Sequence, residues 1–432
     1  MSIKIRATLT NPSFTLEQLE QWSFFAVFLL FPAGIVMPPV LRKGVNLLGY
    51  LLAAFLFVRH WRKLSYVFSQ DILLVIMHGL AIASIFWSAA PDITSESVRA
   101  LLRTSLLGAY LATFYKPDEQ RQLLGKLLLL WGGASLIASL VPGYGQMTGK
   151  YAGAWIGIYG FKYGLGSTMA IGVIIALVTF VGKCERQLAV LSGAAIAFAM
   201  IVLSVSKTSL MSLMIALSIF PLYFIAKRQF KLRVALSALA ILIAVGGVAL
   251  FILNIQTIVV DWLGKDLTFT GRLPLWEAIA RQGAERPLLG YGHGGAFWFT
   301  EYAIEAAYEN QWPHLPPTGT YFDGMHSHNG FIELFVQFGW VGLVLCIVHA
   351  VGLIIRLSAL AFGQRNLEYL WMLQILVLVV FANLAEVGTF LEANNLLWML
   401  YVAMSCSSAV QFHSQAPPDK HRTQWNKARR AD

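Results

Sequence analysis

Twelve runs of about 20 mostly apolar residues recur along this chain of 432 residues. A helix needs about that many apolar residues to cross the hydrocarbon core of a bilayer. The runs predict an all-α fold of about twelve transmembrane helices. They lie near residues 22–41, 44–59, 71–88, 100–115, 124–141, 165–182, 187–205, 208–226, 233–253, 329–355, 367–385 and 391–411.

The composition excludes several other classes of protein. Apolar residues make up 57% of the chain and charged residues 12%, against about 45–50% and about 25% in soluble domains. A soluble enzyme, a disordered chain and a disulfide scaffold are therefore excluded. The three cysteines, Cys184, Cys346 and Cys406, lie far apart in or beside apolar runs and form no metal-binding pair.

The run Leu188–Ala226 is too long for one spanning helix. At about 1.5 Å per residue it would reach roughly 58 Å, nearly twice the core thickness of about 30 Å. The polar stretch Ser204–Ser209 is the only place where it can fold back. We therefore expect Lys207 at a membrane surface.

The distribution of basic residues predicts the orientation of the helices. With the N-terminus in the cytoplasm, 21 of the 32 Lys and Arg residues fall on the inner side, as the positive-inside rule requires. Both termini are then cytoplasmic, and the net charge of +10 reflects cytoplasmic loops rather than a nucleic-acid partner. The resulting segments are an N-terminus (1–21), nine helices (22–253), one long external loop (254–328), three helices (329–411) and a basic tail (412–432).

The long external loop carries two recognisable local patterns. Pro274–Gln282 reads as a short helix whose apolar residues Leu275, Trp276 and Ile279 are expected along the bilayer surface. The stretch Gly290–Gly295 follows no βαβ strand, so we interpret its glycines as turn formers rather than as a dinucleotide-binding motif.

Cationic side chains on the external side have two readings. Arg272 follows a glycine and is suited to grip a phosphate, but a snorkelling headgroup anchor would look the same. Lys207 in the outer turn and Lys162 before a span have the same alternatives.

His328 stands where the tenth span begins. A helix N-terminus disfavours the imidazolium form, so a neutral imidazole there can take a proton from a hydroxyl. The alternatives are a capping or otherwise hydrogen-bonded polar residue, or a metal site with His326 and Asp323 that needs further ligands. Glu386 and Glu392 flank the last outer loop, where they can cap helices, bind an acceptor sugar or pair with the arginines.

Four stretches resemble the O-antigen ligase and Wzy-type polysaccharide polymerase family. The stretch Ser327–Leu343, with its Ser-His-Asn-Gly start, is similar to the family's signature. The other three are Thr270–Arg272 with Trp276 and Arg286–Gly292, Trp87–Pro91, and Gly157–Gly166. Two departures are Ser206-Lys207 where relatives often have Ser-Arg, and Phe161-Lys162-Tyr163 for His-Lys-Asn. Lysine keeps the charge but lacks the guanidinium fork.

The resemblance implies a multi-pass protein of the bacterial inner membrane whose active face is periplasmic. It implies a metal-independent, inverting transfer of a glycan from an undecaprenyl diphosphate carrier to a sugar hydroxyl, without a cofactor. His328 would be the base, and Arg272 and Lys207 would bind the diphosphate. Supporting or acceptor contacts would come from Lys162, Arg286, His326, Asn329 and Glu386.

The likeness favours a polymerase of exopolysaccharide repeat units, of the type that extends rhizobial succinoglycan. Its partners would be lipid-linked oligosaccharide, membrane lipid, and proteins for chain-length control and export. One alternative is an O-antigen ligase acting on lipid A core. A polysaccharide flippase is another, but transporters bury ionisable groups near the midplane, whereas here those groups cluster outside the bilayer.

Overall fold

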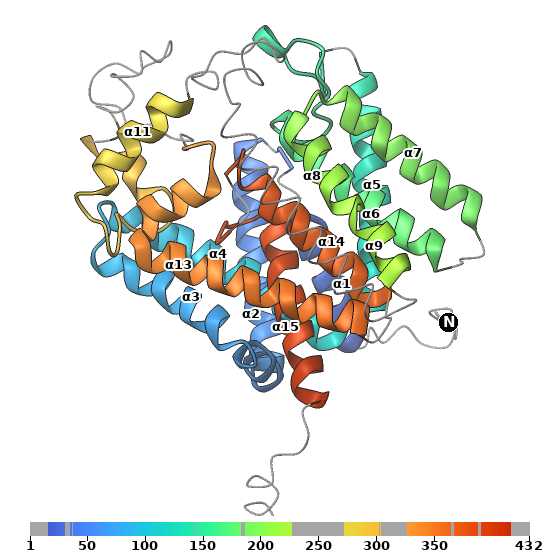
Figure 1. Cartoon of the computed structure of the whole chain (residues 1–432), viewed down its shortest axis with the longest axis horizontal. Helices are drawn as coiled ribbons and strands as arrows, with labels where there is room; N and C mark the ends of the chain where they lie inside the picture. Colours follow the sequence, from blue (N-terminus) through green and yellow to red (C-terminus); the bar gives the residue numbers. More distant parts are fainter. Residues whose placement is uncertain are drawn as a thin grey trace, which may run out of the picture.

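A computed structural model of the chain describes residues 16–30, 35, 36, 38–141, 143–182, 186–226, 272–301, 303, 326–363, 367–387 and 390–415. Regular structure in these ranges is helical, with two isolated β-bridges and no strand. The expected all-α fold is therefore confirmed. Figure 1 shows the helices gathered into one bundle, with α11 lying across one end of α13.

The helices follow the apolar runs closely in the middle of the chain and less closely at its start. Their bounds are α1 Leu16–Leu30, α2 Pro39–Ser69, α3 Ile72–Ala83, α4 Pro91–Phe114, α5 Pro117–Leu140, α6 Lys162–Val181, α7 Gln187–Leu203, α8 Lys207–Leu217, α9 Ile219–Ala226, α11 Arg272–Gly283, α13 Gly330–Ser358, α14 Leu367–Ala382 and α15 Leu396–Gln415.

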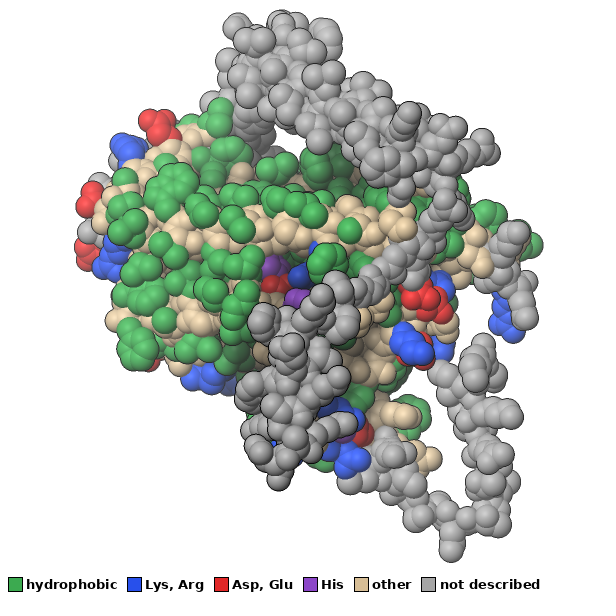
Figure 2. Space-filling model, turned by 60° about the horizontal axis from the view of Figure 1, so that its bottom comes forward, with side chains coloured by type: hydrophobic (Ala, Val, Ile, Leu, Met, Phe, Trp, Pro, Cys, Tyr) green, Lys and Arg blue, Asp and Glu red, His purple; other side chains and the backbone are tan. Residues whose placement is uncertain are grey.

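Five helices in the described ranges are long and apolar enough to cross a membrane. They are Val40–Ser69, Pro117–Leu140, Lys162–Val181, Lys207–Phe224 and Gly330–Gly363. Three shorter apolar helices accompany them, and hydrophobic side chains cover much of the surface in Figure 2. These features support an integral membrane protein. The count of twelve spans stays a prediction, since 233–253 lies outside the described residues.

The structure moves the boundaries of the first predicted spans. Helix α1 begins before residue 22, and α2 continues beyond residue 59 to Ser69, bending at His60 (φ −126°). Pro39 occupies the first turn of α2, where its missing N–H is unneeded and its fixed φ suits a helix.

The predicted reversal between the seventh and eighth spans is confirmed. Helix α7 ends at Leu203, and α8 begins at Lys207. The Ser206 hydroxyl caps α8 by accepting from the Ser209 N–H at 3.4 Å, as serine does at helix starts. Lys207 is therefore the first residue of α8 and is exposed.

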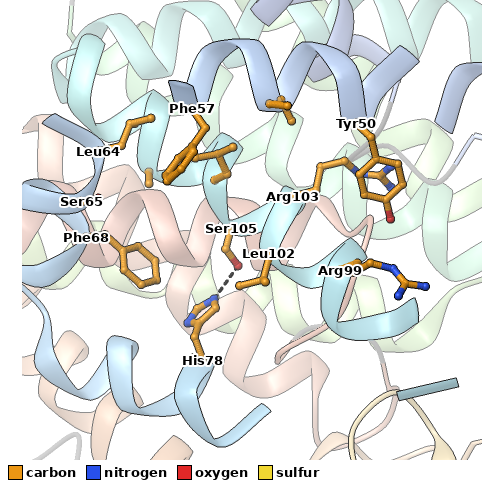
Figure 3. Close-up of a pocket in the computed structure, with 14 residues that line it drawn as sticks. Tyr50, Phe57, Leu64, Ser65, Phe68, His78, Arg99, Leu102, Arg103 and Ser105 are labelled. Atoms are coloured by element: carbon orange, nitrogen blue, oxygen red, sulfur yellow. Dashed lines mark hydrogen bonds between the residues drawn. The ribbon is translucent and has the colours of Figure 1, made fainter. Parts of the chain in front are cut away.

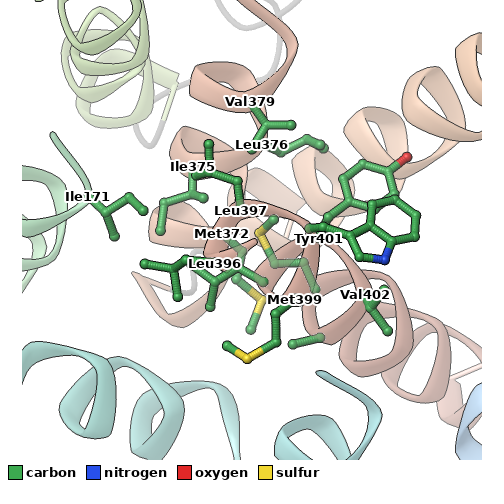
Figure 4. Close-up of a cluster of buried hydrophobic side chains, with 14 of the residues drawn as sticks. Ile171, Met372, Ile375, Leu376, Val379, Leu396, Leu397, Met399, Tyr401 and Val402 are labelled. Atoms are coloured by element: carbon green, nitrogen blue, oxygen red, sulfur yellow. The ribbon is translucent and has the colours of Figure 1, made fainter. Parts of the chain in front are cut away.

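The centre of the bundle is formed by α14 and α15, which pack against α6, α8, α13 and α4. Figure 4 shows their interdigitating side chains, including Ile171, Met372 and Tyr401. Trp371 and Trp398 are also fully buried there. Both helices are therefore enclosed by protein along most of their length.

A buried polar network joins three helices at the end of the bundle remote from His328. Asp71 caps α3 and accepts hydrogen bonds from the Arg356 guanidinium and the Ser405 hydroxyl, both at 2.6 Å. His349 lies 3.2 Å from the same carboxylate. Because an unpaired charge is costly in an apolar interior, this network fixes how α13 and α15 align with the start of α3.

The opposite end of the bundle, here called the His328 end, collects the starts of α4, α6, α8 and α13 and the last turn of α14. Helix α11 spans Arg272–Gly283, which confirms the short helix expected there. Its residues Leu275 and Ile279 are buried against Val336 of α13. The expectation that they lie along the bilayer surface is therefore wrong: they have a protein partner for their apolar face.

Candidate active site

The His328 segment is an irregular turn that leads into α13. The next residue, Asn329, is the N-cap, and its side-chain oxygen accepts from the N–H groups of Phe331 and Ile332 at 3.0 and 3.2 Å. His328 itself has a left-handed backbone (φ 53°) and is half-buried. Because Asn329 caps the helix, the capping reading of His328 is wrong.

Hydrogen bonds from two helices fix the residue before His328. The Trp276 indole of α11 donates to the Ser327 carbonyl at 2.7 Å. The Glu333 carboxylate of α13 accepts from the Ser327 N–H at 3.0 Å. The motif around Trp276 and the Ser-His-Asn motif, far apart in sequence, are thus in direct contact.

His326 packs beside His328. Their ring centroids are 4.2 Å apart, and the His328 N–H donates to Nδ1 of His326 at 3.3 Å. That nitrogen therefore carries no proton in this arrangement. Asp323, the third group of the metal alternative, lies outside the described residues. Within the described ranges, no group of three or more His, Cys, Asp or Glu side chains is placed to hold a metal.

The loop after α14 lies against the His328 segment. The Gly330 N–H donates to the carbonyls of Asn383 and Glu386 at 2.8 and 3.1 Å. A Cβ on Gly330 would lie 2.0 Å from the Asn383 side-chain oxygen, so the close approach requires glycine. Asn329 also donates to the Leu384 carbonyl at 3.3 Å. Asn329 and Glu386, both predicted as supporting residues, are thus brought to His328.

A polar cavity of about 390 Å³ opens beside this loop, between the start of α6 and the segment 387–397. Hydroxyl, amide and carboxyl groups line it, from Tyr163, Ser167, Thr168, Glu392, Asn394 and Asn395. The buried Tyr163 hydroxyl has no partner among the described residues. Glu392 precedes α15, and burial together with the nearby Glu333 carboxylate raises its pKa to about 7. Such a lining can hydrogen-bond a sugar.

The turn that carries Lys207 lies close to the first turns of α6. A Cβ on Gly166 would lie 2.5 Å from the Ser209 hydroxyl and 3.1 Å from Cβ of Ser206. The turn that carries Lys207 therefore packs against the α6 turns that line the cavity. Lys162, the first residue of α6, lies 3.6 Å from the centroid of the Tyr151 ring.

Two of the loop's arginines, Arg272 and Arg286, were predicted site residues, and the structure describes the side chain of only the second. Arg272 begins α11, but its side chain lies outside the described part of the structure. Arg286 donates to the Trp87 carbonyl at 3.2 Å and lies over the Tyr291 ring, so it joins the loop to the turn before α4. The two motifs that contain Trp87 and Arg286 are thereby brought together.

Sequence reasoning missed three polar residues that hold this end together. Glu333 also accepts from the Trp298 indole at 2.9 Å, and Gln337 accepts from the His293 ring and the Gly294 N–H at 3.2 Å each. Burial lowers the pKa of His293 to about 4, which keeps it neutral. Glu333 and Gln337, two polar residues four positions apart in an apolar run, were the sequence signal that could have identified this contact region.

The His328 end thus holds an imidazole on a turn with a left-handed backbone, the turn that carries Lys207, and a cavity with hydroxyl, amide and carboxyl groups in its lining. Residues 192–347 match the O-antigen ligase family model, a range that includes Lys207, Arg272 and His328. This match confirms, over that part of the chain, the resemblance predicted from the motifs.

A more particular similarity is to the exopolysaccharide production protein ExoQ of Rhizobium meliloti (strain 1021). The two sequences are 28% identical over 276 residues, covering 61% of this chain and 60% of that protein. The matched region is therefore less than two thirds of the relative's length.

Proposed function

We propose that this protein polymerises exopolysaccharide repeat units at the periplasmic face of the inner membrane. The donor would be a glycan on undecaprenyl diphosphate, and the acceptor a hydroxyl of a second lipid-linked unit. The observation that carries this proposal is a polar cavity at the start of α6, next to the loop whose carbonyls accept from the Gly330 N–H. The similarity to a protein of exopolysaccharide production favours polymerisation.

The proposed reaction is a single displacement that inverts the sugar. His328 accepts the proton of the acceptor hydroxyl while the hydroxyl oxygen bonds to the anomeric carbon of the donor sugar. The bond from that carbon to the diphosphate breaks, and the leaving group takes the electron pair. Arg272 and Lys207 stabilise the negative charge that develops on it. Tyr163, Glu392 and Asn395 would orient the acceptor sugar.

The direct test is incubation of the purified protein with a defined lipid-linked repeat unit. Longer glycans on the lipid support polymerisation, and their absence with wild-type protein contradicts it. A parallel reaction with chelator tests metal independence, because loss of activity on chelation would overturn the metal-free mechanism.

The second candidate is O-antigen ligation, which the matched family model favours. Its discriminating observation is the product in the presence of lipid A core. Glycan transferred to the core identifies a ligase, whereas chain growth on the carrier with core untouched identifies a polymerase.

A further inference from the structure

A second cavity, of about 510 Å³, lies between α2 and α4. Its walls are mainly apolar, from Ala53, Ala54 and Phe57 on α2 and Leu102, Leu106 and Ala109 on α4. Phe57 and Leu102 are 44% and 40% exposed, so the cavity opens sideways on the outer surface of the bundle. In an integral membrane protein, such an opening between exposed apolar side chains is suited to contact with lipid.

The two ends of this cavity differ in charge. Figure 3 shows Arg99, Arg103 and Tyr50 at one end, and the apolar side chains near Phe68 at the other. The Arg103 guanidinium lies 4.1 Å from the centroid of the Tyr50 ring. Cationic groups at one end of an apolar groove are complementary to a lipid with an anionic head.

The cationic end of this groove adjoins the polar cavity at the start of α6. Arg103 donates to the side-chain oxygen of Asn394, which lines the polar cavity. The Asn394 N–H in turn donates to the Thr104 hydroxyl of α4 at 2.9 Å. The cationic end of the groove therefore lies next to the polar cavity, with Arg103 and Asn394 between them.

We propose that this groove holds the isoprenoid tail of the polyprenyl diphosphate donor, with Arg99 and Arg103 at the end nearer the headgroup. The inference rests on the proposed function. From Tyr50 to Arg59, before the bend at His60, α2 rises about 14 Å, so this part of the groove can follow an extended tail through about half of a hydrocarbon core of about 30 Å. Since the tail already lies in lipid, the gain comes from packing and from aligning the diphosphate.

An ordinary phospholipid shares the anionic head and apolar tail. It does not carry a glycan, however, and so would leave the adjoining polar cavity without a ligand. The connection through Asn394 therefore favours the glycan-bearing carrier.

The test fills the groove and varies the tail of the donor. Ala54→Trp places a large ring in the groove from an exposed position of α2. Val58→Trp is the matched control, because Val58 is 73% exposed on the same helix and lies outside the lining. Each protein is assayed with donors that carry the same repeat unit and diphosphate on either a full-length polyprenyl tail or a geranyl tail.

We expect Ala54→Trp to raise KM for the full-length donor about tenfold and to leave KM for the geranyl donor unchanged. Val58→Trp should change neither. Equal effects of Ala54→Trp on both donors, or no effect, would overturn the tail site. Wild-type transfer from either donor tests the proposed function separately: if it occurs while Ala54→Trp matches its control, only the tail site fails, and if it is absent both proposals fail.

Native mass spectrometry of the protein in lipid nanodiscs distinguishes the two lipids. Bound polyprenyl diphosphate that Ala54→Trp loses, with phospholipid retained, supports the proposal. Loss of phospholipid alone would identify an ordinary lipid site and overturn it.

Discussion

At the His328 end, the residues that secure the start of α13 are the neighbours of His328, not His328 itself. Asn329 caps α13, and Ser327 is bonded to Trp276 and Glu333. The helix start is thus secured by residues on either side of His328. We therefore expect its imidazole to serve the proposed proton transfer rather than the helix start.

Replacing His328 with alanine should therefore abolish activity without loosening the fold. A positioned general base contributes roughly 10²–10⁴-fold, so transfer should fall at least 100-fold while the melting temperature stays near that of wild type. Asn329→Ala should show the opposite balance, losing about 1 kcal/mol of stability with its cap. Wild-type polymer yield from a normally expressed His328→Ala protein would refute the base assignment.

Lys207 is predicted to act through its charge. Removing one group that stabilises developing negative charge costs about 10²–10³-fold in turnover, so Lys207→Ala should lose activity on that order, and Lys207→Arg should retain most of it. Lys43, an exposed lysine in the first turns of α2, serves as the control for a general charge effect. Equal losses in Lys43→Ala and Lys207→Ala would argue against a specific role.

His293 makes the loop after α11 sensitive to acid. Burial holds its pKa at about 4, against an ordinary value of 6.5. Between these pH values the unfolded chain binds a proton that the folded protein excludes, so stability is full above pH 6.5 and falls towards pH 4. The loss should reach roughly 3 kcal/mol at most. Melting temperatures of wild type and His293→Asn at pH 7 and pH 5 test this, and the variant should lose less stability on acidification.

Among the helices, α13 organises the site. Its first turns carry Glu333 and Gln337, which bond the Ser327 and His293 loops, and its start contacts the loop after α14. Helix α11 packs on the same stretch. The site is thus assembled on the first turns of one helix, which a shift of that helix start would disturb as a whole.

Gly330→Ala tests this dependence on the α13 start. Its Cβ would overlap the Asn383 side chain, and such overpacking typically costs about 1–3 kcal/mol. We expect lower thermal stability together with reduced transfer. Gly352 on the same helix has no atom within 4 Å of an added Cβ, so Gly352→Ala should be neutral or slightly stabilising. If both variants behaved alike, the contact with Asn383 would not matter.

Among the described residues, two polar regions lie at opposite ends of the helix bundle. The His328 end holds the cavity, the irregular loops and the exposed Lys207, whereas the other end holds the Asp71 network. The apolar flanks between them suit a lipid surface. An enzyme that joins a lipid-bound donor to a hydroxyl acceptor needs this arrangement, since its substrates meet where membrane and water adjoin.

The orientation predicted from basic residues can be tested by cysteine labelling. In a Cys184→Ser background, Thr148→Cys probes the His328 end and Ser69→Cys the opposite end; both positions are exposed. A membrane-impermeant maleimide should label Thr148→Cys in intact spheroplasts and Ser69→Cys only after permeabilisation. The reverse pattern would invert the topology and move the site to the cytoplasm.

The apolar runs and the polar stretch at Ser204–Ser209 were sufficient to predict most helices and the reversal before Lys207. These features depend on residues close together in sequence, because a helix buries its own backbone polar groups and an interrupted apolar run must turn at its polar residues. The motifs likewise identified His328, Arg272 and Lys207 as candidates through family resemblance.

Tertiary structure alone decided which segments meet at the His328 end. The contacts of Gly330 with Asn383, of Trp276 with Ser327 and of Arg103 with Asn394 join segments tens to hundreds of residues apart. No local pattern encodes such pairings, because they depend on how helices pack once each has formed. Packing therefore made α11 a partner of α13 and left α2 and α4 separated by a groove.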